Sequence, residues 1–173
     1  LDFVIKHDQC PHDFIAKVAA ILSECRSGYR VIDGTLWPLS SDEENTAVIN
    51  AVSAVSSVQF SGARTHLRNA ASNLTQGKYS ESIRESISAV ESVARVLESS
   101  GDFSKALALL ESKAKLHPAL KRGFSALYGY TSDEQGIRHA LLDTEQSEVD
   151  ETDALFFIGA CASFVSYLIN KSK

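Results

Sequence analysis

The segment from Ala154 to Ile169 constrains the fold more than any other, because it is apolar on nearly every side of a helix. Its main stripe, at helical spacing, consists of Ala154, Phe157, Ile158, Cys161, Ala162, Val165, Leu168 and Ile169. The other sides carry Leu155, Phe156, Phe164 and Tyr167. A helix of this kind lies at the centre of a bundle or pairs with another chain. The run is shorter than the roughly 20 apolar residues of a membrane span and contains two serines, so we expect no membrane partner.

The rest of the chain is dominated by the same helical period. The clearest stripe begins after Ser80 and steps by four and three residues, which places its members on one helix face. These members are Ile83, Ile87, Val90, Ala94 and Leu97. Similar stripes run through residues 13–25, 47–55, 60–74 and 102–116. With 44% apolar residues and only 3 prolines, the chain has the composition of an ordered helical domain.

One stretch near the start breaks the helical pattern. Asp33-Gly34 separates Tyr29–Ile32 from Thr35–Leu39, and an Asp-Gly pair between two strand-like runs is the strongest short signal of a β-hairpin. Pro38 restricts the second strand to a sheet edge, because proline has no amide donor. A lone hairpin is marginally stable, so this one must pack on helices. The predicted fold class is therefore all-α, a helical bundle with a small β-hairpin near the N-terminus.

The boundary between two parts of the chain is predicted at Ser40-Ser41. Residues 1–40 would form an N-terminal helix and the hairpin, packed on the bundle, and residues 41–173 would form the helical domain. The sequence contains no methionine, even at its first position. We therefore expect it to be a piece of a longer protein that carries further domains.

Net charge argues against a broad nucleic-acid-binding face. Lys plus Arg total 17 against 22 Asp plus Glu, a net charge of −5, whereas proteins that rely on phosphate contacts are usually basic. Cys10, Cys25 and Cys161 have no zinc spacing and suit free thiols in a reducing compartment. The acidic residues between Asp143 and Asp153 match no calcium loop. Because neither pattern fits a metal site, we expect no metal or cofactor. No signal peptide is visible, so we expect a cytoplasmic protein.

Aromatic, basic and imidazole residues gather between His117 and Asp143. Pro118 suits the first turn of a helix, because the amide at that position would be unpaired anyway. We expect Gly129 to end this helix. Residues 131–134, Thr-Ser-Asp-Glu, carry the hydroxyl and carboxylate groups that cap the start of a second helix.

Arg138 and His139 on that second helix permit two interpretations. They lie beside an apolar edge, so one of them should be partly buried. In the first interpretation they form a catalytic or RNA-contacting pair. In the second, which we prefer, Arg138 forms a structural polar pair with Glu91, and His139 caps or fills a gap. Glu91 borders the apolar face of its helix, where an unpaired charge would be costly.

Two further sets of residues are candidates for nucleic-acid contact. Arg64, His66 and Arg68 form a small basic surface on the helix predicted at 60–74, and Tyr128 and Tyr130 have rings that could stack on a base. The alternatives are a solvated helix face for the first set and buried turn aromatics for the second. We prefer these alternatives.

Three phrases together resemble the C-terminal helical module of AbiJ-like abortive-infection proteins in the HEPN superfamily. They are SIRESISAVESV at 82–93, LHPALKRGFSALYGYTSDEQGIRHALLD at 116–143 and DALFFIGACASFVSYLIN at 153–170. The hairpin segment that precedes this module in such proteins is similar to SGYRVIDGTLWPLSSDEE at 27–44. The resemblance implies an antiparallel HEPN-like helical bundle, a homodimer and a place in bacterial antiviral defence.

The resemblance also bears on activity, since many HEPN proteins are metal-independent ribonucleases. Their signature is an Arg followed several residues later by a His, brought together across a dimer to bind the scissile phosphate and act on the ribose hydroxyl. In this chain Arg138 and His139 are adjacent, and no second His follows. Adjacent helical side chains point about 100° apart, so the two do not easily address one phosphate from one subunit.

Two functions therefore remain as hypotheses, and enzymatic activity separates them. The first is a non-catalytic or weakly catalytic interaction and dimerisation module, a sensor or scaffold, in an abortive-infection protein that acts in phage defence. It would form a homodimer and hold a protein partner or attached domains. The second is a HEPN-type ribonuclease, in which Arg138 holds phosphate and His139 serves as general acid or base across a homodimer.

Overall fold

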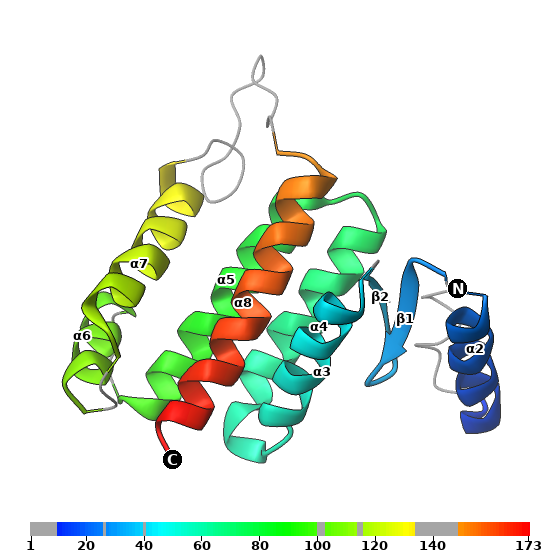
Figure 1. Ribbon diagram of the computed structural model, residues 1–173, viewed down its shortest axis with the longest axis horizontal. Helices are drawn as coiled ribbons and strands as arrows, with labels where there is room; N and C mark the ends of the chain where they lie inside the picture. The colour runs from blue at the N-terminus through cyan, green and yellow to red at the C-terminus, as the bar shows by residue number, and fades with distance from the viewer. Residues whose placement is uncertain (1–9, 26, 40, 100–102, 114–115, 134–148) are drawn as a thin grey trace.

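The computed structural model describes residues 10–25, 27–39, 41–99, 103–113, 116–133 and 149–173. In chain order, its elements are α2 (His12–Glu24), β1 (Tyr29–Ile32), β2 (Thr35–Pro38), α3 (Asp42–Ala54), η1 (Val58–Phe60), α4 (Ser61–Thr75), α5 (Tyr79–Leu97), α6 (Phe103–Lys113), α7 (Pro118–Asp133) and α8 (Glu151–Lys171). Among the described residues, the only sheet is the hairpin β1–β2. The predicted all-α bundle with a small hairpin near its start is confirmed (Figure 1).

Two helices begin at reciprocal caps between residues three apart in the sequence. The Ser41 hydroxyl accepts a hydrogen bond from the Glu44 amide, and the Glu44 carboxylate accepts one from the Ser41 amide, both at 3.1 Å. Asp150 and Asp153 form the same arrangement at the start of α8, at 3.0 and 3.2 Å. Such caps satisfy amides that have no partner within the helix and stabilise its start by about 0.5–2 kcal/mol. They therefore fix where α3 and α8 begin.

The hairpin turn has the backbone conformation that an Asp-Gly pair supplies. Asp33 and Gly34 both have positive φ, 52° and 66°, as a two-residue turn between right-twisted strands requires. The register pairs Ile32 with Thr35 and Arg30 with Trp37. The Trp37 ring is fully buried, and its indole N–H donates to the Ile32 carbonyl at 3.2 Å.

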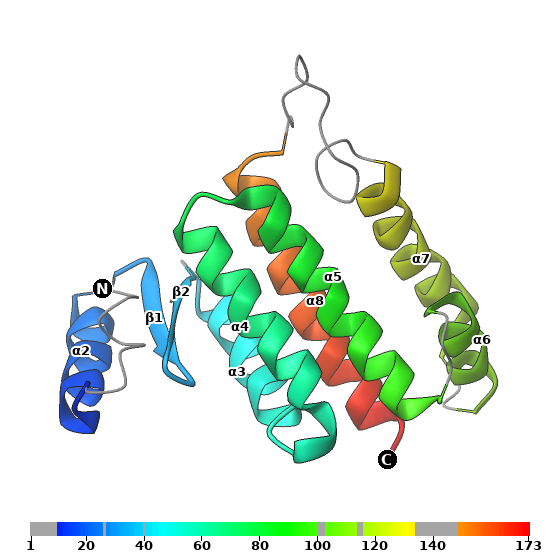
Figure 2. The same cartoon turned by 180° about the vertical axis from the view of Figure 1, so that it is seen from behind.

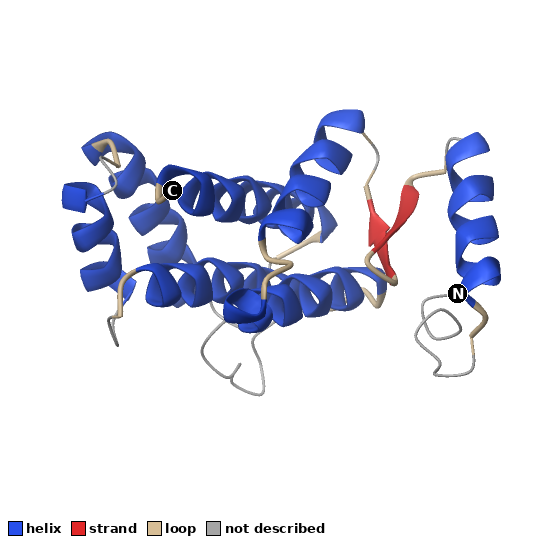
Figure 3. Ribbon diagram, turned by 90° about the horizontal axis from the view of Figure 1, so that it is seen from below, coloured by secondary structure: helices blue, strands red, loops and turns tan. Residues whose placement is uncertain are grey.

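The hairpin covers one side of the bundle. Strand β2 packs on α4, and β1 contacts α3 on one side and α2 on the other. All four residues of β2 are buried. Figure 3 shows the two strands standing between α2 and the bundle. The hairpin thus contributes its apolar side chains to the core, and α2 packs on the hairpin.

Helices α4 and α5 form a tight antiparallel pair, seen side by side in Figure 2. Gly77, with φ of 72°, makes the turn between them. A Cβ atom added at Gly62 would lie 3.0 Å from the Ser92 hydroxyl, so the two helices approach closely there. The buried Ser82 hydroxyl donates to the Ala70 carbonyl at 2.9 Å and satisfies a polar atom within this contact.

Helix α8 packs against α5 and α3, and nine of its residues are buried. It runs in the same direction as α5, because both helices begin at the upper end of the bundle in Figure 1 and end at the lower one. By length and composition alone, α8 is the one described helix that is apolar enough to cross a membrane, a test that core helices of soluble proteins also pass. Half of its most apolar stretch is buried within the bundle.

Helices α6 and α7 form an outer pair at one side of the bundle (Figure 1). The Lys113 ammonium lies 2.7 Å from the Glu98 carboxylate at the end of α5, and Lys121 on α7 lies 2.6 Å from Glu111 on α6. The second ion pair joins α7 to α6, and the first joins α6 to the end of α5 in the bundle. As predicted, α7 begins at Pro118.

The expectation that Gly129 ends α7 is wrong, because the helix continues to Asp133. Glycine inside a helix costs only about 1 kcal/mol relative to alanine, and side-chain packing offsets this cost. Tyr128 packs against Phe103 on α6, and Thr131 is buried, its hydroxyl donating to the Tyr128 carbonyl at 2.8 Å. Residues 131–133, predicted to cap the start of a second helix, instead belong to the last turn of α7, and the rest of that predicted helix, around Arg138, lies outside the described residues.

Candidate functional site

Two of the three basic residues predicted on α4 hold the hairpin. The Arg64 guanidinium makes two hydrogen bonds to the Asp33 carboxylate, one of them from Nε at 2.7 Å. Hydrogen bonding to this carboxylate, together with its charge, raises the pKa of Arg64. One helical turn further on, Arg68 Nε donates to the Thr35 hydroxyl at 3.1 Å. These contacts explain Arg64 and Arg68 as anchors of the hairpin turn on α4.

His66 points to the other side of α4 and meets α5. Its Nδ1 atom lies 2.8 Å from a carboxylate oxygen of Glu85, and Asn69 donates to the same oxygen at 3.3 Å. This contact orients the imidazole ring and links the two helices. The structure therefore separates the predicted set: Arg64 and Arg68 face the hairpin, whereas His66 faces α5.

The two tyrosines of α7 take different environments. Tyr128 is half-buried, with its ring centroid 4.9 Å from that of Phe103. Tyr130 is 37% exposed and lies against Phe157 of α8, with centroids 5.4 Å apart. Both rings thus pack on apolar neighbours within the chain, and both lie within α7 rather than in a turn.

Of the predicted pair of Glu91 and Arg138, the structure describes only Glu91. Glu91 is half-buried on α5. Arg138 and His139 lie outside the described residues, so the structural pair and the catalytic pair both stay predictions. Within the part of the chain that the structure describes, no group of three or more His, Cys, Asp or Glu side chains could hold a metal ion.

A hollow of about 770 Å³ lies at the C-terminal end of α8. Its described lining consists mainly of serines and amide side chains from α3, η1, α8 and the residues next to them, together with apolar residues that include Phe60 and Ile169. Lys173 is the only charged residue in that described lining. The described lining contains no carboxylate or imidazole and therefore offers no acid–base pair.

The most unusual surface among the described residues is the outward face of α8. This face is formed by Thr152, Phe156, Gly159, Ala160, Ser163, Tyr167 and Asn170, which recur at helical spacing and are exposed or half-buried. Phe156 is 58% exposed, the most of any phenylalanine in the described chain. From Ala154 to Asn170 the sequence has no charged residue. A solvated helix face normally carries charges, so this composition is typical of a covered surface.

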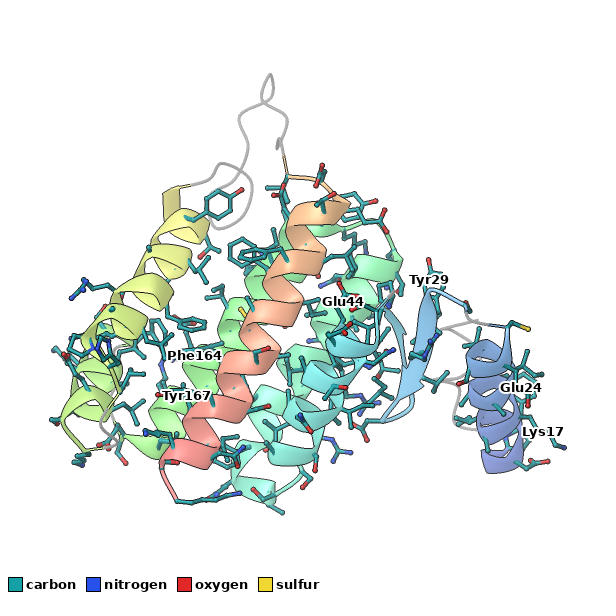
Figure 4. The ribbon with its side chains drawn as sticks, viewed as in Figure 1. Lys17, Glu24, Tyr29, Glu44, Phe164 and Tyr167 are labelled. Atoms are coloured by element: carbon teal, nitrogen blue, oxygen red, sulfur yellow. The ribbon has the colours of Figure 1, made fainter. Side chains whose placement is uncertain are left out.

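Aromatic rings border the outward face along its α7 side. Phe164 stacks on Phe124 of α7 with ring planes 8° apart, and Tyr167 lies 6.0 Å from Phe164 between centroids. Figure 4 shows Phe164 and Tyr167 on the side of α8 toward α6 and α7. At the other end, Phe156 meets Phe157 edge to face. The outward face is therefore bordered by aromatic contacts on the side toward α7.

Sequence reasoning identified α8 as a central or pairing helix but did not identify which of its sides is uncovered. The signal for the uncovered side is the line of small and polar residues Gly159, Ala160 and Ser163 among larger apolar ones. The sequence also did not reveal that Asp33 is the partner of Arg64. Among known proteins, no family model matches the chain, and neither curated proteins nor solved structures give a match.

Proposed function

We propose that this chain is an interaction and dimerisation module, and that the outward face of α8 is the surface through which two copies associate. The observation that carries the proposal is the absence of charge along this partly exposed face, from Ala154 to Asn170. Apolar surface exposed to water is unfavourable. When a second copy covers this face, the apolar surface of both copies is buried, and the hydrophobic free energy of that burial stabilises the dimer.

The exposed aromatic side chains set the scale of this gain. Burying a phenylalanine completely is worth about 1.5–3 kcal/mol, so Phe156, which is 58% exposed, would contribute about 1 kcal/mol per copy. In a two-fold dimer every such contribution occurs twice, because the same surface is used by both subunits. The hydrophobic free energy of association also includes contributions from Tyr167, Ala160 and the apolar parts of neighbouring side chains. The loss of translational and rotational freedom on association opposes it.

The proposed cellular setting is a bacterial abortive-infection system in the cytoplasm. Its support is the likeness of the quoted phrases to the helical module of AbiJ-like HEPN proteins. In that setting the module would act as a sensor or scaffold that holds a partner protein or attached domains. The two arginines of α4 favour a structural role for that helix over nucleic-acid contact, because Arg64 and Arg68 bind the hairpin of their own chain.

Sedimentation equilibrium of the wild type and two variants tests the proposal. Phe156→Lys places a charge on the outward face, and we expect it to convert a dimer to a monomer. Leu109→Lys is the matched control, because Leu109 is an exposed apolar residue on α6, 41% exposed and away from this face. The control should remain dimeric. A monomeric wild type, or dimers of equal stability in all three proteins, would contradict the proposal.

Two further results would replace the proposal with another function. Flotation of the wild type with phospholipid vesicles would make α8 a membrane-binding helix. Degradation of RNA by the purified chain, lost on His139→Ala, would establish the ribonuclease alternative with Arg138 and His139 as its reacting groups.

A further inference from the structure

We propose that α8 pairs with α8 of a second copy in the antiparallel direction, about a two-fold axis that passes between Cys161 and Ala162. This inference rests on the proposed function and gives it a defined geometry. It follows from two independent properties of the helix, the charge at its ends and the order of side-chain sizes along its outward face.

The ends of α8 carry opposite charges. Glu151 and Asp153 lie in the first turn, and Lys171 lies in the last, with no charge between Ala154 and Asn170. An antiparallel pair places the acidic end of each helix beside the basic end of the other, which is electrostatically complementary. A parallel pair would place the acidic first turns together, where like charges repel. Charge therefore selects the antiparallel direction.

Side-chain size along the outward face selects the same axis. Phe156 and Tyr167 lie on either side of the small residues Ala160 and Ser163. About an axis between Cys161 and Ala162, Phe156 lies opposite Tyr167 of the partner subunit, and Ala160 lies opposite Ser163 of the partner subunit. Small residues at the axis allow the two helices to approach closely, and the aromatic side chains pack on either side of this contact.

The charged ends agree with that axis. Asp153 and Lys171 both lie beside the outward face at 100° per residue, and about this axis Asp153 lies opposite Lys171 of the partner subunit to within one residue. Asp153 is half-buried and Lys171 is exposed. Charge, aromatic packing and small residues thus indicate one register, although each is a separate property of the sequence.

Disulfide formation between introduced cysteines tests the direction and register. The full chain would carry Cys10→Ser and Cys25→Ser, since these thiols are accessible or partly accessible and Cys161 is buried. Thr152→Cys and Asn170→Cys are made separately, because both positions are exposed at opposite ends of the outward face. In the proposed pair two copies of the same variant hold their introduced thiols about 25–30 Å apart along the axis. A disulfide needs Cα atoms within about 7 Å.

We expect neither variant to cross-link alone under mild oxidation and the mixture of the two, after subunit exchange, to give a linked dimer. Asn170→Cys mixed with Ser104→Cys, an exposed position on α6, is the matched control and should not link. Circular dichroism checks that each variant keeps the helical fold. Linkage of Thr152→Cys with itself would indicate a parallel pair and overturn the inference.

A dimer that fails to link in every combination would also overturn the proposed pairing, while leaving dimerisation itself intact. A chain that sediments as a monomer would instead contradict the proposed function as well. Cross-linking pattern and sedimentation together therefore distinguish failure of the geometry from failure of the function.

Discussion

The contact between Arg64 and Asp33 makes a quantitative prediction about how the hairpin is held. Arg64→Met keeps the aliphatic stem and removes the guanidinium, whereas Asp33→Asn removes the charge and keeps a residue that tolerates the positive φ of 52°. The side chains are 40% and 20% exposed, so solvent screens the pair. Exposed pairs are worth about 0.2–1 kcal/mol, and two parallel hydrogen bonds place this one near the upper limit. The expected coupling in a double-mutant cycle is therefore about 1 kcal/mol.

Urea unfolding followed by two signals measures this coupling and locates it. Trp37 is the only tryptophan and is fully buried in the hairpin, so its fluorescence reports the hairpin, while far-ultraviolet circular dichroism reports the helices. Lys17→Met is the matched control, because Lys17 and Asp13 form an ion pair with side chains 73% and 70% exposed. Its removal should change neither signal. A coupling between Arg64 and Asp33 below about 0.3 kcal/mol would refute the account of hairpin docking.

Three other predictions follow from the core and from the sequence. Phe164→Ala removes a ring that is 2% exposed and stacked on Phe124, and it should lower the free energy of unfolding in urea by about 3–5 kcal/mol. Burial raises the pKa of Cys161 from 9.0 to about 12, so the folded state disfavours its thiolate. The free energy of unfolding should therefore fall as pH rises from about 9 to about 12, because the thiol then ionises only in the unfolded state. Iodoacetamide at pH 9 should label Cys161 only after unfolding. An equal loss of stability over that pH range in Cys161→Ala would contradict this assignment. For the predicted pair, Glu91→Gln and Arg138→Gln should show strong coupling in a double-mutant cycle, whereas independent effects on stability would exclude a direct contact.

Local sequence signals predicted most of the fold because they act over short distances. The stripe from Ile83 to Leu97 and the Asp33-Gly34 turn each specify an element through neighbouring residues. The end of α7 was missed for a related reason. Gly129 is a helix breaker by local propensity, and the packing of α7 against α6 and α8 outweighs that propensity.

Contacts between distant segments could not be predicted in the same way. Asp33 and Arg64 are 31 residues apart, and nothing in their local sequences marks them as partners. The periodicity of α8 predicted a central or pairing helix, but a helix that is apolar on all sides does not reveal which side its own chain leaves uncovered. Only the packing of α3 and α5 around it identifies the side that carries Phe156 and Ser163.

The central claim, that a second copy covers the outward face of α8, is tested most directly by labelling a thiol on that face. Ser163→Cys, in the chain with Cys10→Ser and Cys25→Ser, places a single accessible thiol near the proposed axis, because Cys161 is buried. The reduced protein is treated with a maleimide at increasing protein concentration. We predict that labelling slows as the protein dimerises and that Phe156→Lys restores the fast rate. A labelling rate that stays the same while the protein passes from monomer to dimer with increasing concentration would contradict the claim.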